Sequence, residues 1–233
     1  MKSRILIRRG NLLLYRERCL RERFLIPIYG ASSWDPSNLD AASAYVGLLH
    51  AESEAALEYM VRNTLDNSVE VTKRYASHKV LTNALIYYKR HIYAKVPELR
   101  LIPSRKDLER DNARTIALWD DHAQAHYETL LKTNHGAGMR YVEKLLHPLG
   151  VVVDRERFNK LKDFGLKEIA DVADIGSTDL RELVSLRGVA MHATLSVVAT
   201  ALSATNPIEI GKRGEAAAKF TMNLAKNIAR SAW

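Results

Sequence analysis

An arginine and a histidine, Arg187 and His192, lie five residues apart within the apolar stretch 183–193. The imidazole of histidine titrates near neutral pH, so it can accept a proton in one step of a reaction and return it in another. A guanidinium can bind two phosphate oxygens with parallel hydrogen bonds and stabilise negative charge that develops there. The pair therefore has the groups that acid–base chemistry at a phosphate ester requires.

The spacing alone does not bring the two side chains together. On an ideal α-helix, positions 187 and 192 lie about 140° apart. Three solutions remain open: a bend at Gly188, an arginine side chain that reaches back, or two copies of the chain that meet across a two-fold axis. Without its context, the pair is also typical of a histidine at the edge of a core and an arginine that extends to solvent.

The sequence around this pair resembles the HEPN family of small helical ribonucleases and nucleotide-binding proteins. The resemblance rests first on Arg187-x4-His192. Segment 48–58 is similar to the family's early helix, and its Glu54 matches an acidic residue near the active site. Segment 134–151 is similar to the middle section of toxin-like branches. In all, the resemblance covers residues 40–205.

The resemblance implies metal-independent RNA cleavage that leaves a 2′,3′-cyclic phosphate and a 5′-hydroxyl. It implies three catalytic residues: His192 as general acid or base, Arg187 as the phosphate ligand, and Glu54 as a group that orients His192 or accepts a hydrogen bond from Arg187. It also implies a homodimer whose two copies form the site, acting as a toxin or anti-phage effector with an antitoxin or defence-system protein as partner.

One position departs from the family pattern. Gly188 follows the arginine, where ribonuclease members commonly have Asn, Asp or His. The missing polar side chain leaves an alternative from another class, a non-catalytic helical module of HEPN type that binds RNA or a protein. A helical adaptor unrelated to the family is the third hypothesis.

Composition and charge limit the partners. The chain has 233 residues, of which 47% are hydrophobic and 27% charged. Its net charge of +8 favours a polyanionic partner, with nucleic acid as the first candidate and an anionic membrane surface as the second, and the family resemblance makes RNA the expected nucleic acid. Cys19 is the only cysteine, which excludes a disulfide framework and fits a reducing compartment. No apolar run approaches the roughly 18–20 residues of a membrane span. We expect a cytoplasmic protein with no membrane partner.

No cofactor motif or metal site is expected. His122 and His126 have the spacing of a metal-binding pair on a helix, but no third ligand is identifiable.

Helical periodicity and the lack of period-2 alternation predict an all-α fold, a helical bundle of HEPN type with extra N-terminal and C-terminal helices. Long helices are expected over 3–26, 39–65, 68–95, 105–132 and 213–230. A strand is considered at 151–153, and a helical turn or two at 164–173. We expect one domain, with a basic helix and linker at 1–38, a HEPN-like core at 39–205 and a basic helix at 206–233.

The first helix is expected to be amphipathic. Its expected apolar face has Ile5, Leu12 and Cys19 at every seventh position, with Leu13, Leu20 and Phe24 beside them. The opposite face is rich in arginine. It is either a solvated face or a surface that follows phosphates or lies on a membrane.

Overall fold

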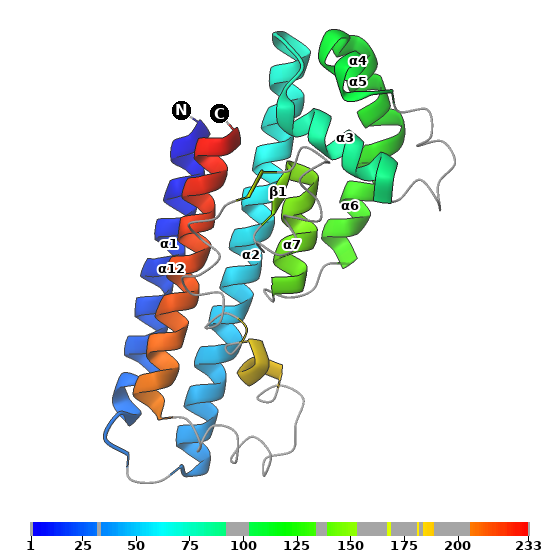
Figure 1. Ribbon diagram of the computed structural model, residues 1–233. Helices are drawn as coiled ribbons and strands as arrows, with labels where there is room; N and C mark the ends of the chain where they lie inside the picture. The colour runs from blue at the N-terminus through cyan, green and yellow to red at the C-terminus, as the bar shows by residue number, and fades with distance from the viewer. Residues whose placement is uncertain are drawn as a thin grey trace.

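The computed structural model describes residues 2–31, 34–91, 103–133, 139–152, 167–168, 181, 184–188 and 206–232. Within these ranges the fold is all-α, as the periodicity predicts, apart from one short pair of strands (Figure 1).

The longest helix, α2 (Pro36–Arg74), runs from one end of the molecule to the other (Figure 1). Pro36 fixes the backbone of its first position, and the carboxylate of Asp35 accepts a hydrogen bond from the backbone N–H of Asn38 at 2.8 Å. The helix therefore begins three residues before the predicted start at 39.

The predicted break in this helix near residue 65 is wrong. The sequence there is polar, but the buried hydroxyls of Thr64, Ser68 and Thr72 donate to backbone carbonyls in the preceding turn. Because these groups are satisfied within the helix, α2 continues to Arg74. The chain breaks instead before α3 (Lys79–His91), where the hydroxyl of Thr72 accepts a hydrogen bond from the backbone N–H of His78.

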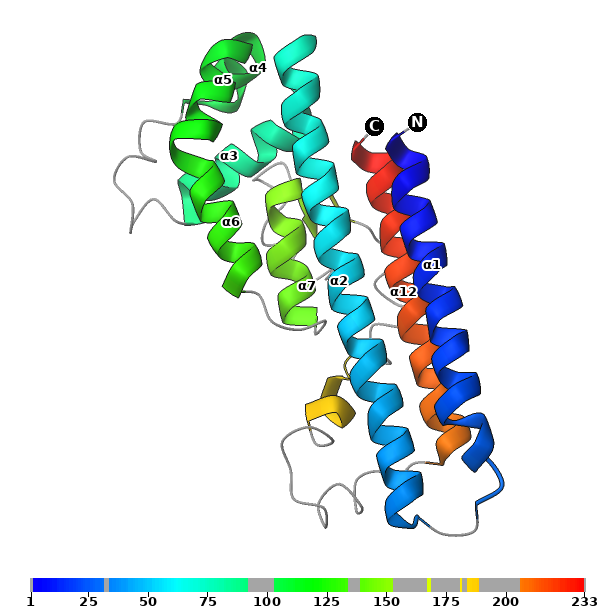
Figure 2. The same ribbon diagram turned by 180° about the vertical axis from the view of Figure 1, so that it is seen from behind.

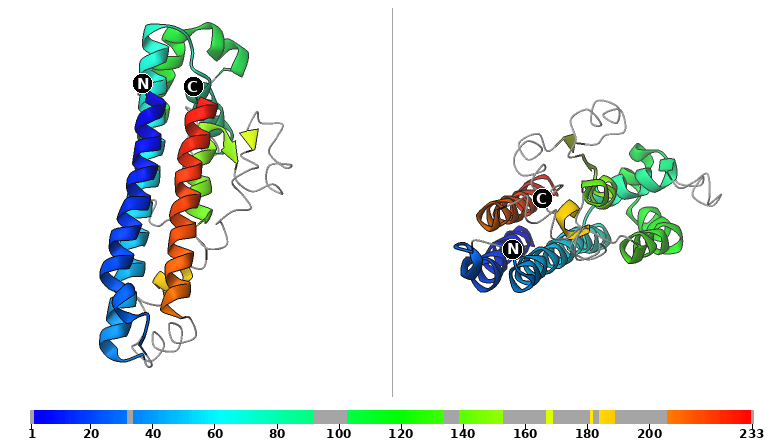
Figure 3. Two further views of the ribbon diagram at one scale, coloured as in Figure 1. Left: turned by 90° about the vertical axis from the view of Figure 1, so that its left-hand side faces the viewer. Right: turned by 90° about the horizontal axis from the view of Figure 1, so that it is seen from below.

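Two helices far apart in the sequence, α1 (Lys2–Phe24) and α12 (Pro207–Ala232), lie antiparallel to each other beside α2, from its N-terminal end to beyond its middle (Figures 1 and 2). Seen end-on, the three form a bundle (Figure 3). The side chain of Asn206 accepts a hydrogen bond from the backbone N–H of Ile208 at 2.8 Å. Asn206-Pro207 therefore opens α12, which begins before the predicted residue 213.

The expected apolar face of α1 is confirmed for Leu13 and Leu20 but not for Ile5 and Leu12. Leu6, Leu13 and Leu20 are at most 6% exposed, whereas Ile5 and Leu12 are 39% and 43% exposed. Both stripes repeat every seven residues, so the period could not choose between them. The expectation that Ile5 and Leu12 face the core is wrong.

A second group of helices packs around the other half of α2 (Figure 1). The single helix expected over 105–132 is interrupted, because Asp111 ends one helix and caps the next by accepting a hydrogen bond from the backbone N–H of Arg114 at 3.0 Å. Ser104 caps the first of these helices by accepting a hydrogen bond from the backbone N–H of Asp107. This group comprises α3, α4 (Arg105–Arg110), α5 (Asn112–Leu118), the π-helical η3 (Trp119–Ala123), α6 (Gln124–Thr133), α7 (Met139–Leu146) and the 3-10 turn η4 (His147–Leu149).

A brief strand follows α7. Gly150 turns the chain with a φ of 81°, and β1 (Val151–Val152) then pairs in parallel with β2 (Lys167–Glu168). The strand expected at 151 is confirmed. The helical turn expected over 164–173 is not found at 167–168, because these residues form the second strand.

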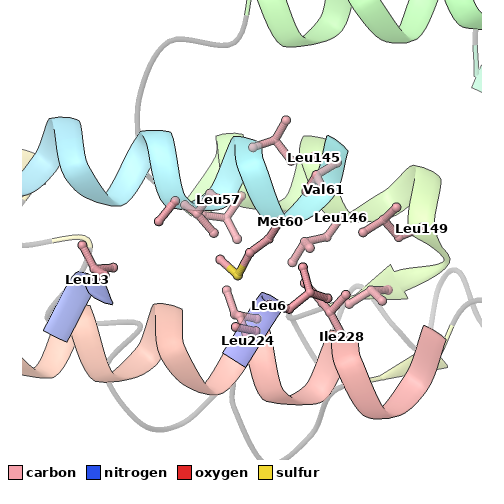
Figure 4. Packing of buried hydrophobic residues seen from close by; sticks show 14 of the residues in the cluster. Leu6, Leu13, Leu57, Met60, Val61, Leu145, Leu146, Leu149, Leu224 and Ile228 are labelled. Carbon is pink, nitrogen blue, oxygen red and sulfur yellow. The ribbon is translucent and has the colours of Figure 1, made fainter. Parts of the chain in front are cut away.

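One apolar core joins both groups of helices. Near the middle of α2, Leu57 and Met60 meet Leu6 of α1, Leu224 of α12 and Leu146 of α7 (Figure 4). Helix α2 is thus packed against α1 and α12 on one side and against α7 on another, and this packing fixes the position of the side chains on its remaining surface.

Candidate functional site

The first residue of the predicted pair lies on a short helical segment, 184–188, beside the first half of α2 (Figures 1 and 2). Leu186 is buried and Val184 packs against the core, so this segment is anchored to the bundle. Arg187 is left half-buried at its edge.

A histidine and a glutamate on one face of α2 lie in the part of the molecule where the charge of Arg187 acts. His50 and Glu54 are one turn apart, and the His50 Nδ1 and Glu54 Oε2 atoms are 3.9 Å from each other. The positive charge of Arg187 acts on His50. We refer to Arg187, His50 and Glu54 as the Arg187 cluster.

The environment of His50 sets its protonation. Burial lowers the pKa of His50 below 6.5, the charge of Arg187 lowers it further, and the carboxylate of Glu54 acts in the opposite direction. The imidazole is therefore neutral at pH 7. Since His50 is only 3% exposed while Glu54 is 24% exposed, the glutamate and the arginine are the members of the cluster that a substrate could reach.

The predicted site residues fare differently. Glu54 lies one turn from His50 and the charge of Arg187 acts on His50, whereas His192 is outside the described residues. Gly188 itself is helical, and a Cβ added there would meet nothing within 4 Å. The backbone of this segment therefore does not require glycine at that position.

His50 was missed as a member of the site. Its spacing of four residues from Glu54 places both on one face of a helix, which was visible in the sequence. The sequence did not show that the segment with Arg187 would pack against that same face.

The lowered pKa of His50 predicts how stability depends on pH. Between the folded pKa and 6.5, the unfolded chain binds more protons than the folded chain, so the free energy of unfolding decreases as the pH falls through this window. His50→Gln should flatten this part of the curve. Urea denaturation at about pH 7.5 and about pH 5.5 measures the change. His122→Gln, at a half-buried histidine of η3, is the control and should keep the wild-type slope.

Neither a metal site nor a membrane span is found in the part of the chain that the structure describes. No group of three or more His, Cys, Asp or Glu side chains could hold a metal ion there. None of its helices combines the length and the apolar character needed to cross a bilayer.

Comparisons with protein-family models, with curated proteins and with solved structures give no match to this chain. The chemistry of the Arg187 cluster must therefore be inferred from its own residues.

Proposed function

We propose that this chain is a metal-independent endoribonuclease of HEPN type, acting as a toxin or anti-phage effector. The observation that supports this best is the Arg187 cluster. The segment that carries the first half of the Arg-x4-His motif lies beside α2, where the charge of Arg187 acts on His50, the close neighbour of Glu54. The net charge of +8 is consistent with an RNA substrate.

In the proposed reaction Arg187 binds the scissile phosphate through two parallel hydrogen bonds. Because the guanidinium is half-buried, its attraction for the charge that builds on the phosphate oxygens is screened less than at an open surface. His192 removes the proton of the 2′-hydroxyl, whose oxygen attacks the phosphorus. The bond to the 5′-oxygen breaks, and that oxygen takes up a proton from the second copy of the histidine in a homodimer.

The two α2 residues have supporting roles. Glu54 orients His192 or accepts a hydrogen bond from Arg187, and its partial exposure leaves it accessible for either task. His50 stays neutral and buried, so it adds no positive charge that would repel the guanidinium. We assign His50 as a positioning residue.

The test is cleavage of a labelled single-stranded RNA in the presence of EDTA. We expect products that end in a 2′,3′-cyclic phosphate and a 5′-hydroxyl, and we expect His192→Ala to lower the rate by about 10²- to 10⁴-fold. His122→Ala should cleave like the wild type. Cleavage that needs a divalent ion, or that His192→Ala leaves intact, would contradict the proposal.

Gly188 favours a second candidate, a non-catalytic module that binds RNA or a protein. The position after Arg187 has no polar side chain, although the space around it would admit one. RNA binding that weakens with salt, without cleavage by the wild type, would select this candidate.

A further inference from the structure

An open groove of about 600 Å³ lies between α1 and α2. We call it the α1–α2 groove. It is lined by Ile5, Arg8, Arg9, Asn11, Leu12 and Tyr59.

The groove has an exposed apolar surface. Ile5, Leu12 and Tyr59 are 39%, 43% and 40% exposed. Leu48 is 45% exposed and lies on the same side of α2 about three turns before Tyr59. Glu52, which forms an ion pair with Arg16, lies between them. Apolar side chains exposed in rows along two neighbouring helices are typical of surfaces that receive a further helix.

The charged side chains that line the groove are all positive. Arg8 and Arg9 form no ion pair within the described residues, and none of the lining residues is acidic. The guanidinium of Arg9 lies over the ring of Tyr59, 5.5 Å from its centroid, and its buried Nε has no hydrogen-bond partner within that same part of the chain. A carboxylate brought into the groove would meet guanidinium groups that no neighbour neutralises.

We propose that the α1–α2 groove binds an amphipathic helix of a partner protein, with aliphatic residues three and four positions apart and glutamate or aspartate beside them. Such a helix would cover the exposed apolar row and neutralise the arginines, and it would add a further helix to the bundle of α1, α2 and α12.

Other occupants fit the groove less well. RNA would bind the arginines, but the aliphatic side chains of Ile5, Leu12 and Leu48 offer no hydrogen bonds or stacking surface to it. A second copy of this chain would bring equal positive patches together across a two-fold axis. The proposal does not rest on the ribonuclease function, because Tyr59 and His50 are nine positions apart and hence face opposite sides of α2, about 180° apart.

The probe is a fluorescein-labelled synthetic helix with leucine at the a and d positions of each heptad and glutamate at the flanking positions. Fluorescence anisotropy should detect its binding to the full chain. We expect the double variant Arg8→Glu/Arg9→Glu, and separately Leu12→Asp, to weaken binding by about 10- to 100-fold. Arg110→Glu and Ile208→Ser, exposed positions outside the groove, are the matched controls and should bind like the wild type.

Several outcomes would overturn the proposal. One is equal binding of the probe by wild type and groove variants whose circular dichroism and thermal unfolding are unchanged. Another is equal binding of a helix with lysine in place of glutamate. A third is that the acidic helix does not bind the wild type, while the groove variants lose binding to single-stranded RNA, binding to anionic vesicles or self-association.

Discussion

Replacing Arg187 by alanine is expected to lower the rate of RNA cleavage by about 10²- to 10³-fold, the usual cost of removing one group that stabilises developing charge. The same substitution should raise the pKa of His50, because the charge of Arg187 is one of the two causes that lower it. The rate is measured with labelled RNA, and the pKa by NMR titration of the imidazole. The second readout does not depend on activity.

Arg187→Lys separates charge from shape. A lysine keeps the positive charge, so the pKa of His50 should stay close to its wild-type value. It cannot form two parallel hydrogen bonds to a phosphate, so cleavage should remain well below that of the wild type. If the pKa of His50 is the same in Arg187→Ala as in the wild type, the Arg187 cluster is not formed in solution. If Arg187→Ala raises the pKa of His50 but cleaves RNA like the wild type, the cluster is present and the proposed catalytic role of Arg187 is wrong.

Replacing Gly214 by alanine is expected to reduce the free energy of unfolding by about 3 kcal/mol, through overpacking and a disturbed buried hydrogen bond. A Cβ at Gly214 would overlap the hydroxyl of Tyr45 and lie 2.8 Å from a methyl carbon of Leu49. Tyr45 is fully buried, and its hydroxyl donates to the carboxylate of Glu17 at 2.9 Å. The loss should exceed the roughly 1 kcal/mol that alanine gains over glycine in a helix.

The carboxylate that Tyr45 contacts cannot easily lose this hydrogen bond. Glu17 is 2% exposed, and burial raises its pKa although the hydrogen bond from Tyr45 and the charge of Arg21, whose Nε is 3.2 Å away, act in the opposite direction. A displaced tyrosine would leave the buried oxygen of Glu17 without this donor.

Urea denaturation of three variants tests this account. Gly30→Ala is the control, because an added Cβ there meets nothing within 4 Å, and it should change stability by less than about 0.5 kcal/mol. Tyr45→Phe combined with Gly214→Ala should destabilise less than the sum of the two single changes, because the hydroxyl that overlaps the new methyl is absent. Wild-type stability of Gly214→Ala would refute the prediction.

Most of the helical framework could be predicted from local patterns. The buried face of α2 could be predicted, because small or apolar residues recur there with the helical period over many turns. The residues at this spacing are all buried: Ala42, Val46, Leu49, Ser53, Ala56 and Met60. Helix ends were less predictable where a side chain decides them. Asp111 interrupts the periodic stretch over 105–132 by capping a new helix. In α2, the hydroxyl groups that bond to backbone carbonyls continue the helix through a polar segment that resembles a helix end.

The candidate site depended on information that no local pattern contains. Arg187 and Glu54 were proposed from a family resemblance, and their catalytic roles stay predictions. The participation of His50 follows only from the packing of segment 184–188 against α2, more than a hundred residues away in the chain. The choice between the stripes of Leu6 and Ile5 likewise depends on which side of α1 meets α12.

The pairing of α1 with α12 has a consequence for how this protein is made. Arg21 of α1 forms an ion pair with Glu215 of α12 across 194 positions of sequence. While the chain emerges from the ribosome, α1 can pack against α2, but it lacks its second neighbour until the segment with α12 has also been synthesised. The α1–α12 pair therefore cannot assemble before α12 has been synthesised, and a nascent chain that stalls earlier would expose the leucines of α1 that α12 covers.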